Sequence, residues 1–90
     1  MRAAELVREA KEQVAELTGL NVEGATSLDR RNGNGDGDSG WVVTVVALEL
    51  ARTPNTMDVL GSYEVSLSDD GDLLGFRRLR RFTRSAAEEG

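Results

Sequence analysis

The segment from Trp41 to Leu50 constrains the fold most, because it has the pattern of a strand with apolar side chains on both faces. One face carries Trp41, Val43, Val45 and Ala47, and the other carries Val42, Val46, Leu48 and Leu50. Strands of this kind are normally covered on both sides. The rest of the chain, or a partner, therefore has to supply two covering layers.

A helix is predicted over residues 2–18. Its apolar side chains recur at spacings of three or four residues and form one stripe, at Leu6, Ala10, Val14 and Leu17. Gly19 follows as a residue able to adopt the left-handed conformation that ends a helix. The stripe is expected to face the sheet.

Four strands are predicted, at about 21–30, 41–51, 58–68 and 72–83. The last two are joined by Asp70-Gly71, a strong hairpin signal. If these two residues form the loop, the register contains three apolar pairs and one opposite-charge pair: Leu67–Leu74, Val65–Phe76, Val59–Phe82 and Glu64–Arg77.

The predicted fold class is α+β, with an N-terminal helix packed on a four-stranded antiparallel meander sheet. A chain of 90 residues fits a single domain over 1–90. Residues 32–40 are glycine, asparagine, aspartate and serine, which predicts a flexible loop. The residues after Thr83 are expected to fray.

The chain is acidic, with a formal net charge of -5, but its C-terminal segment is basic. Residues 1–76 carry 14 acidic and 6 basic side chains, whereas residues 77–90 carry 2 acidic and 5 basic ones. This balance argues against a dedicated nucleic-acid binder. Charges interrupt the first helix and the longest apolar run is strand-sized, so we expect no signal peptide, no membrane span and a cytoplasmic protein.

The chain contains neither histidine nor cysteine. The commonest general base near neutral pH is therefore missing, together with thiolate chemistry, disulfides and the usual zinc ligands. Asn32 begins a segment that matches the first positions of an EF-hand loop, but the twelfth position, where calcium needs a bidentate glutamate, is Val43. We predict no catalysis, no cofactor and no metal site.

The candidate partner-binding residues are Trp41 and five arginines in the last strand: Arg77, Arg78, Arg80, Arg81 and Arg84. Strict alternation predicts that Arg78, Arg80 and Arg84 share one face and that Arg77 and Arg81 share the other. Two interpretations are open. The arginines bind an anion or acidic partner, or they pair within the chain with Glu49, Asp58 and Glu64. Phe76 and Phe82, on the same strand, are expected to pack in the core.

The order of several short motifs resembles the gas vesicle protein GvpO family. The motifs are Trp41 with the strand that follows it, Arg52-Thr53-Pro54, Asp58-Val59-Leu60, Tyr63-Glu64-Val65 and the arginine strand from Phe76 to Arg84. The resemblance covers about residues 22–84. It implies an accessory factor for gas vesicle formation. Together with the missing catalytic residue types, this leads to our first hypothesis, a non-catalytic assembly factor that contacts other vesicle proteins, shell or accessory, in the cytoplasm or on the vesicle.

Two other functions remain open at this point. One is a regulator of the gas vesicle gene cluster that binds nucleic acid through the arginine strand, and the other is an unrelated inhibitor-like or sensor domain. Independently, one helix can cover only one face of the sheet. Some apolar surface along Trp41–Leu50 should therefore stay uncovered, and a second copy of the chain, forming a homodimer, is its simplest partner.

Overall fold

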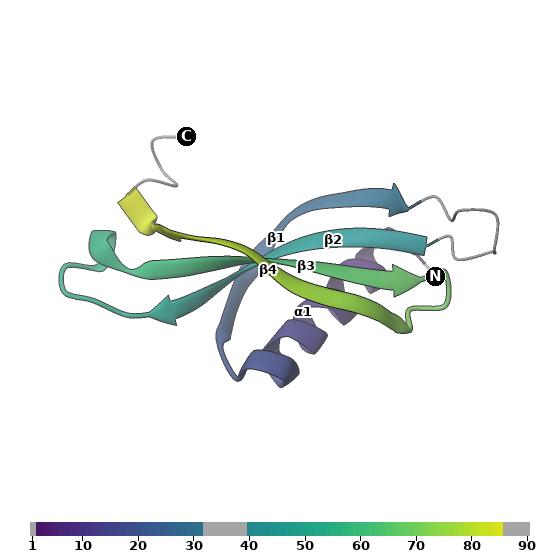
Figure 1. Cartoon of the computed structure of the whole chain (residues 1–90), viewed down its shortest axis with the longest axis horizontal. Coiled ribbons are helices and arrows are strands. Elements are labelled where there is room, and N and C mark those ends of the chain that lie inside the picture. The colour runs from purple at the N-terminus through teal and green to yellow at the C-terminus, as the bar shows by residue number, and fades with distance from the viewer. Residues whose placement is uncertain (1, 32–39, 86–90) are drawn as a thin grey trace.

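The computed structural model describes residues 2–31 and 40–85 and has the predicted α+β architecture (Figure 1). In chain order its elements are α1 (Ala3–Thr18), β1 (Asn21–Arg31), β2 (Gly40–Leu50), the short 3-10 helix η1 (Asn55–Met57), β3 (Val59–Ser68) and β4 (Leu73–Thr83). The strands form one antiparallel sheet in the order β1-β2-β3-β4, which is the predicted meander. The predicted flexible loop, apart from Gly40, and residues 86–90 of the predicted frayed end lie outside the described residues.

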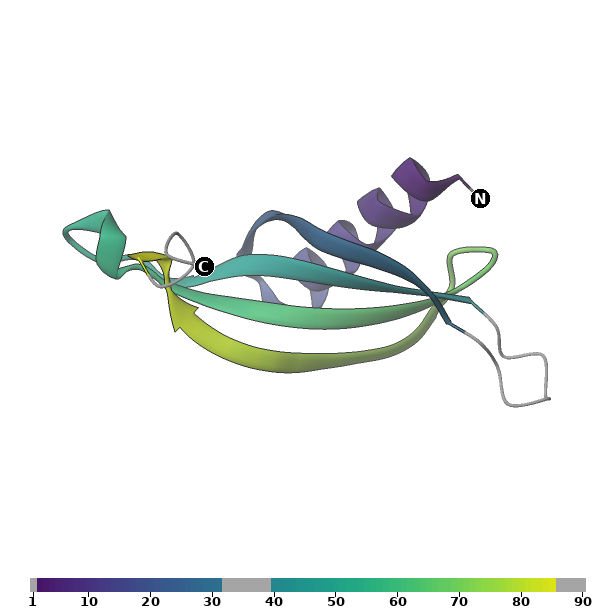
Figure 2. The same cartoon turned by 90° about the horizontal axis from the view of Figure 1, so that it is seen from above.

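Helix α1 lies along one face of the sheet, against β1, β2 and β3 (Figure 2). Leu6, Ala10 and Val14 are fully buried and follow the stripe that their four-residue spacing predicts. The helix ends as expected at Gly19, which has a φ of 73° and donates its N–H to the carbonyl oxygen of Ala15 at 2.8 Å.

The prediction that Leu17 faces the sheet is wrong, because this side chain is 52% exposed. Its helical angle agrees with the buried stripe, so the cause is its place along the axis, in the last turn of α1. Beyond the chain reversal at Gly19, Leu20 packs against the core instead.

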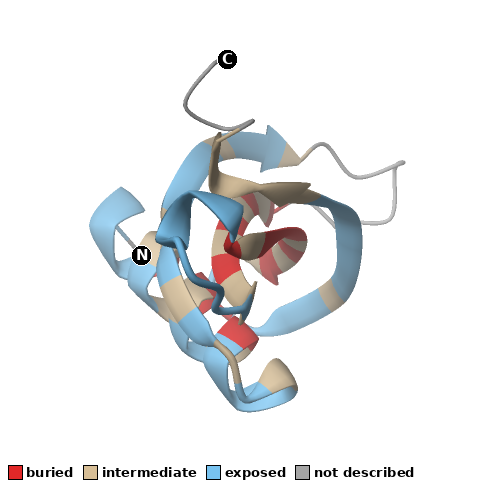
Figure 3. Cartoon of the chain, turned by 90° about the vertical axis from the view of Figure 1, so that its left-hand side faces the viewer, coloured by how far each residue is buried: buried red, intermediate tan, exposed pale blue. Residues whose placement is uncertain are grey.

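The core lies between α1 and the two central strands. Its sheet residues alternate along each strand and are Val43, Val45 and Ala47 on β2 and Tyr63, Val65 and Leu67 on β3. Viewed along the long axis of the molecule, the buried residues gather toward the centre of the ribbon (Figure 3). We call the sheet surface that carries these residues the helix-side face and the opposite surface the open face.

Part of the open face is buried around Leu60. Leu48, Leu60 and Phe82 stand opposite one another across β2, β3 and β4. Leu60 is only 3% exposed although it lies outside the cluster that packs on α1. Val42, Val46 and Leu48 are half-buried on the open face, which therefore keeps some of the uncovered apolar surface that the sequence predicts. Leu50 is 45% exposed, but the register shift after Leu48 pairs it with Val59 and places it on the helix-side face.

The turn between β3 and β4 is one residue longer than predicted. Gly71 has a φ of 90° and donates its N–H to the carbonyl oxygen of Ser68 at 2.9 Å, while the N–H of Ser68 donates to the carbonyl oxygen of Asp72 at 2.8 Å. Ser68 Oγ accepts the N–H groups of Asp70 and Asp72 at 3.2 and 3.0 Å. This is a three-residue loop with glycine in its left-handed position, so the predicted two-residue loop Asp70-Gly71 is wrong.

The longer turn and a second irregularity change part of the predicted register. Two predicted pairs are correct, Val65–Phe76 and Glu64–Arg77. The other two are wrong: the observed pairs are Leu67–Leu73, Leu60–Phe82 and Val59–Thr83. The ladder shifts by one residue between Ser66 and Leu67, near the turn, and again between Ser62 and Tyr63, in the middle of β3. Between these two shifts the side chains alternate as predicted.

Candidate functional site

Strand β4 is an edge strand that exposes both cations and large apolar side chains. Of the seven large hydrophobic residues that are exposed in the described part of the chain, four lie on it: Leu73, Leu74, Phe76 and Leu79. Four of the five candidate arginines also lie on β4, and Arg84 follows it directly. The opposite edge strand, β1, exposes small or polar residues along its middle, from Ala25 to Ser27. The two edges of the sheet are therefore chemically different.

A β-bulge at Leu79 decides which way the arginines face. Leu79 is an extra residue between Arg78 and Arg80 in the ladder with β3. A bulge of this kind changes the face that later side chains take. Arg78 and Arg81 therefore share the helix-side face, while Arg77 and Arg80 lie on the open face. The predicted strict alternation, which separates Arg78 from Arg81, is wrong.

Arg78 and Arg81 share one buried carboxylate. The side chain of Glu49 is 8% exposed, and its Oε1 lies 2.9 Å from Nε of Arg81 and 3.4 Å from Nη1 of Arg78. Its Oε2 accepts the hydroxyl hydrogen of Tyr63 at 2.7 Å. Glu49 stands on β2 and reaches β4 by crossing β3 at Gly61, where a Cβ atom would overlap Oε2. Glycine at this position leaves the room that the carboxylate occupies.

Tyr63 connects this cluster to the partly exposed ring of Phe76. Its ring stacks on Phe76 with centroids 5.5 Å apart and an interplanar angle of 14°. Phe76, expected in the core, is 36% exposed, so only one side of its ring is packed in this way. Burial raises the pKa of the Tyr63 phenol, and the hydrogen bond to Glu49 raises it further, against an opposing effect of Arg78 and Arg81.

The two arginines on the open face have different surroundings. Arg77 pairs with Glu64 on β3, with 3.2 Å between Nε and Oε1, as the predicted opposite-charge pair requires. The guanidinium of Arg80 lies over the ring of Phe82, 4.8 Å from its centroid. Among the residues that the structure describes, Arg80 has no carboxylate partner.

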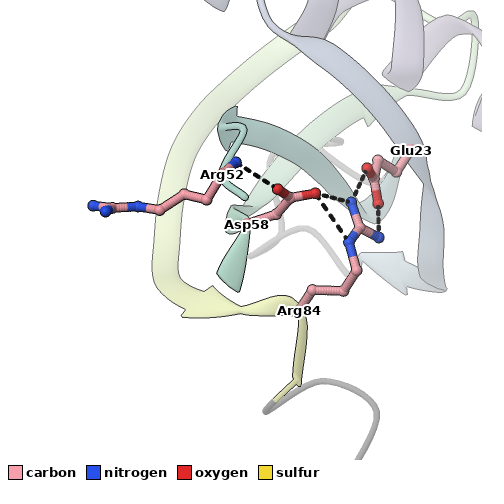
Figure 4. A network of polar contacts seen from close by, with 4 residues as sticks. All are labelled: Glu23, Arg52, Asp58 and Arg84. Atoms are coloured by element: carbon pink, nitrogen blue, oxygen red, sulfur yellow. Dashed lines mark hydrogen bonds and ion pairs between the residues drawn. The ribbon is translucent and has the colours of Figure 1, made fainter. Parts of the chain in front are cut away.

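Arg84 joins the two edges of the sheet (Figure 4). Its Nη1 and Nη2 donate to the two carboxylate oxygens of Glu23 on β1 at 3.0 and 2.6 Å. Its Nε and Nη2 donate to Oδ2 of Asp58 at 3.2 and 3.1 Å, and the other oxygen of Asp58 accepts the N–H of Arg52 at 2.7 Å. Hydrogen bonds to Glu23, and then to Asp58, raise the pKa of Arg84. The geometry gives Arg84 a structural role.

Trp41 does not join the arginine strand. It stands on β2, two strands from β4, and packs partly buried against the core. The guanidinium of Arg30, on β1, lies 4.9 Å from the centroid of the Trp41 ring. Arg30 also pairs with Asp69 at 2.8 Å. The structure therefore separates Trp41 from the other candidate site residues.

Sequence reasoning named three of the four carboxylates that pair with the candidate arginines, Glu49, Asp58 and Glu64. It missed the fourth, Glu23, and the parts that Gly61 and Tyr63 play in the Glu49 cluster. A glycine between Leu60 and Ser62, two residues before Tyr63, gives little signal by itself. The exposure of Leu73, Leu74 and Leu79 was also missed, because apolar side chains in an alternating strand are ordinarily assigned to the core.

The described residues contain no cluster of three or more aspartate or glutamate side chains arranged to hold a metal ion, and no helix among them is both long and apolar enough to cross a bilayer. Fold and site together define a small α+β domain in which one helix covers a four-stranded meander and leaves an arginine-rich edge strand exposed.

The family model for "Gas vesicle synthesis protein GvpO" matches residues 1–88, and the chain belongs to this family. The resemblance found in the sequence is thereby confirmed. No solved structure gives a significant match.

Three curated relatives are similar to the chain. "Gas vesicle protein O" of Streptomyces sp. (strain CB03234) is 43% identical over 83 residues, which cover 92% of this chain and 60% of the relative. The protein of the same name from Haloferax mediterranei is 31% identical over 80 residues, covering 89% and 54% of the two chains. "Gas vesicle protein O1" of Halobacterium salinarum is 36% identical over 52 residues, covering 58% and 44%. The chain thus spans at most about three-fifths of the length of these relatives.

Proposed function

We propose that residues 1–90 act as one GvpO-like domain, a non-catalytic accessory factor in gas vesicle formation that works by contacting other gas vesicle proteins. The family match and the names of the relatives support the vesicle role. The observation that supports action by contact is the edge strand β4, which presents arginines beside exposed leucine and phenylalanine side chains. Interfaces between proteins favour arginine and aromatic residues in this way. The proposed location is the cytoplasm and the surface of the growing vesicle.

The absence of histidine and cysteine from all 90 residues supports a non-catalytic role for this segment. The alternative of nucleic-acid binding has less support, because four of the five arginines already face carboxylates of the same chain. A phosphate-binding strand would instead direct its guanidinium groups outward to neutralise phosphates.

The residue to test is Arg80. Charge reversal of Arg78 and Arg81 is a poor test, because both new carboxylates would face the buried Glu49 and could unfold the sheet. Arg80→Glu changes the same charge without removing an ion pair within the described residues. The matched control is Arg8→Glu, an exposed position on α1, which packs mainly on β1, β2 and β3.

Each variant is expressed in a vesicle-forming cell that lacks its own copy of the gene, and vesicle yield is measured by buoyancy and electron microscopy. We expect Arg80→Glu to reduce the yield and Arg8→Glu to leave it unchanged, with both purified variants melting like the unaltered protein. A normal yield from Arg80→Glu would remove the open face of β4 from the proposal.

A further inference from the structure

The helix-side face of β4 is not covered by the helix. Helix α1 packs on β1, β2 and β3, whereas β4 continues the same face beyond it. The side chains of β4 on this face change from apolar to basic along the strand, with exposures of 38% for Leu73, 36% for Phe76, 51% for Arg78 and 56% for Arg81. We call these four residues the β4 strip.

The basic end of the β4 strip is fixed in position yet incompletely neutralised. One oxygen of Glu49 serves two guanidinium groups, and its other oxygen is taken by Tyr63. Two cations facing one carboxylate leave one positive charge, and each guanidinium has five N–H donors. Arg78 and Arg81 remain about half exposed, so their outward donors are available to a second carboxylate.

The apolar end of the β4 strip lies beside this pair. Phe76 rests on Tyr63 and keeps part of its ring exposed, and it is two residues from Arg78 on the same face. Side chains of an extended segment repeat on one face every second residue. A segment lying along β4 would therefore meet Phe76 with one side chain and the guanidinium pair with the side chain two residues away.

We propose, resting on the function proposed above, that the β4 strip is the receptor for an extended segment of a partner protein in which an apolar residue and an aspartate or glutamate stand two positions apart. The carboxylate lies between Arg78 and Arg81, and the apolar side chain lies on Phe76. Glu49 is a positioning residue, because it orients both guanidinium groups from below and does not touch the partner.

Charge complementarity selects this occupant over two others. A second copy of β4 would place arginine against arginine across the contact, which is repulsive. A nucleic acid would gain from the guanidinium groups, but its phosphate backbone would leave Leu73 without an apolar partner. An acidic segment with apolar neighbours satisfies both ends of the strip.

The test is fluorescence-anisotropy binding of a labelled peptide in which leucine and glutamate alternate with threonine between them. Controls are the same peptide with glutamine for glutamate and an oligothymidylate strand of equal net charge. We expect the acidic peptide to bind, the glutamine peptide to bind at least about tenfold more weakly, and Arg81→Gln to weaken the acidic peptide by about tenfold, as expected for loss of charge-assisted hydrogen bonds.

The matched control variant is Arg77→Gln, which removes the same charge from the same strand but on the open face. It should weaken binding by much less than Arg81→Gln, and Phe76→Ser should weaken it as well. If Arg81→Gln unfolds the protein, combining it with Glu49→Gln removes the buried carboxylate that has lost the closer of its two cations. The double variant should fold and still bind weakly.

Four results would each overturn the proposal that the β4 strip is a receptor. They are equal losses from Arg77→Gln and Arg81→Gln, equal binding of the two peptides, tighter binding of oligothymidylate than of the acidic peptide, and no peptide binding at all. This outcome is separate from the vesicle assay. Suppose that Arg80→Glu fails to support vesicles and that the unaltered protein binds no acidic peptide. The accessory role would then stand, and the β4 strip would no longer be its receptor.

Discussion

Replacing Gly61 by alanine tests the arrangement around Glu49. A Cβ atom at this position would overlap Oε2 of Glu49 and lie 2.9 Å from Cε2 of the Tyr63 ring. Glu49 has a flexible side chain, so its carboxylate can move aside. The cost of the substitution is therefore not the overlap itself but the contacts that the carboxylate gives up when it moves.

The magnitude follows from burial. Tyr63 is 6% exposed, and its hydroxyl would lose its acceptor, which costs about 1–3 kcal/mol for a buried polar group. Arg78 and Arg81 are half exposed, so their lost pairing adds at most about 1 kcal/mol after solvent screening. Alanine recovers about 0.4–1 kcal/mol by restricting the unfolded chain. We expect Gly61→Ala to destabilise the protein by about 1–3 kcal/mol.

Urea unfolding measures this change, with Gly24→Ala as the control. An added Cβ at Gly24 meets nothing within 4 Å, so alanine there should be neutral or stabilising by up to about 1 kcal/mol. In a Glu49→Ala background the penalty at Gly61 should shrink, giving a coupling energy of about 1–2 kcal/mol. Equal stability of the Gly61 and Gly24 variants, or an unchanged penalty without Glu49, would refute the reasoning.

Two further outcomes are expected. Leu6→Ala, at a fully buried position, should lower the unfolding free energy by about 2–5 kcal/mol in a urea titration. Leu17 is 52% exposed, so Leu17→Ala should lower it by less than about 1 kcal/mol. Similar losses from the two variants would contradict the packing of α1. Because the pKa of Tyr63 is raised in the folded protein, its contribution to stability is complete below the ordinary phenol pKa of 10.0 and is lost as pH rises through the folded value. Absorbance titration follows this tyrosine directly, because the chain has only one. Tyr63→Phe should remove this tyrosine's share of the loss of stability at alkaline pH. An ordinary titration midpoint would show that the hydroxyl is not held by Glu49.

The sequence predicted the elements well because burial imposes a period on each of them. The stripe through Leu6, Ala10 and Val14 leaves little choice of element or face, and the apolar run Trp41–Leu50 leaves little choice of element. The same reasoning predicted the Glu64–Arg77 pair, since both residues lie in the part of the hairpin where the register is regular.

The site was less predictable, for a physical reason. One extra residue, such as Leu79 in its bulge or the third residue of the turn before Asp72, changes which side chains share a face without changing composition or mean polarity. Leu17 shows a second limit, because a helical angle describes direction around the axis but not whether the core extends that far. The pairing of Arg78 with Arg81 needed knowledge of both the bulge and the room at Gly61.

The Arg84–Glu23 contact joins the first and last strands of the sheet, as the closing contact of a barrel would. Every strand ladder joins neighbours in the chain, so the meander can grow hairpin by hairpin. The bonds from Arg84 to Glu23 span 61 residues, the largest separation among the side-chain hydrogen bonds of the described residues, and they close the sheet into a ring at one end. At the other end of the sheet, Arg30 on β1 pairs with Asp69 in the turn before β4 at 2.8 Å. Ion pairs therefore tie β1 to the β3–β4 hairpin near both ends, so side chains hold the two edges together where no strand ladder does.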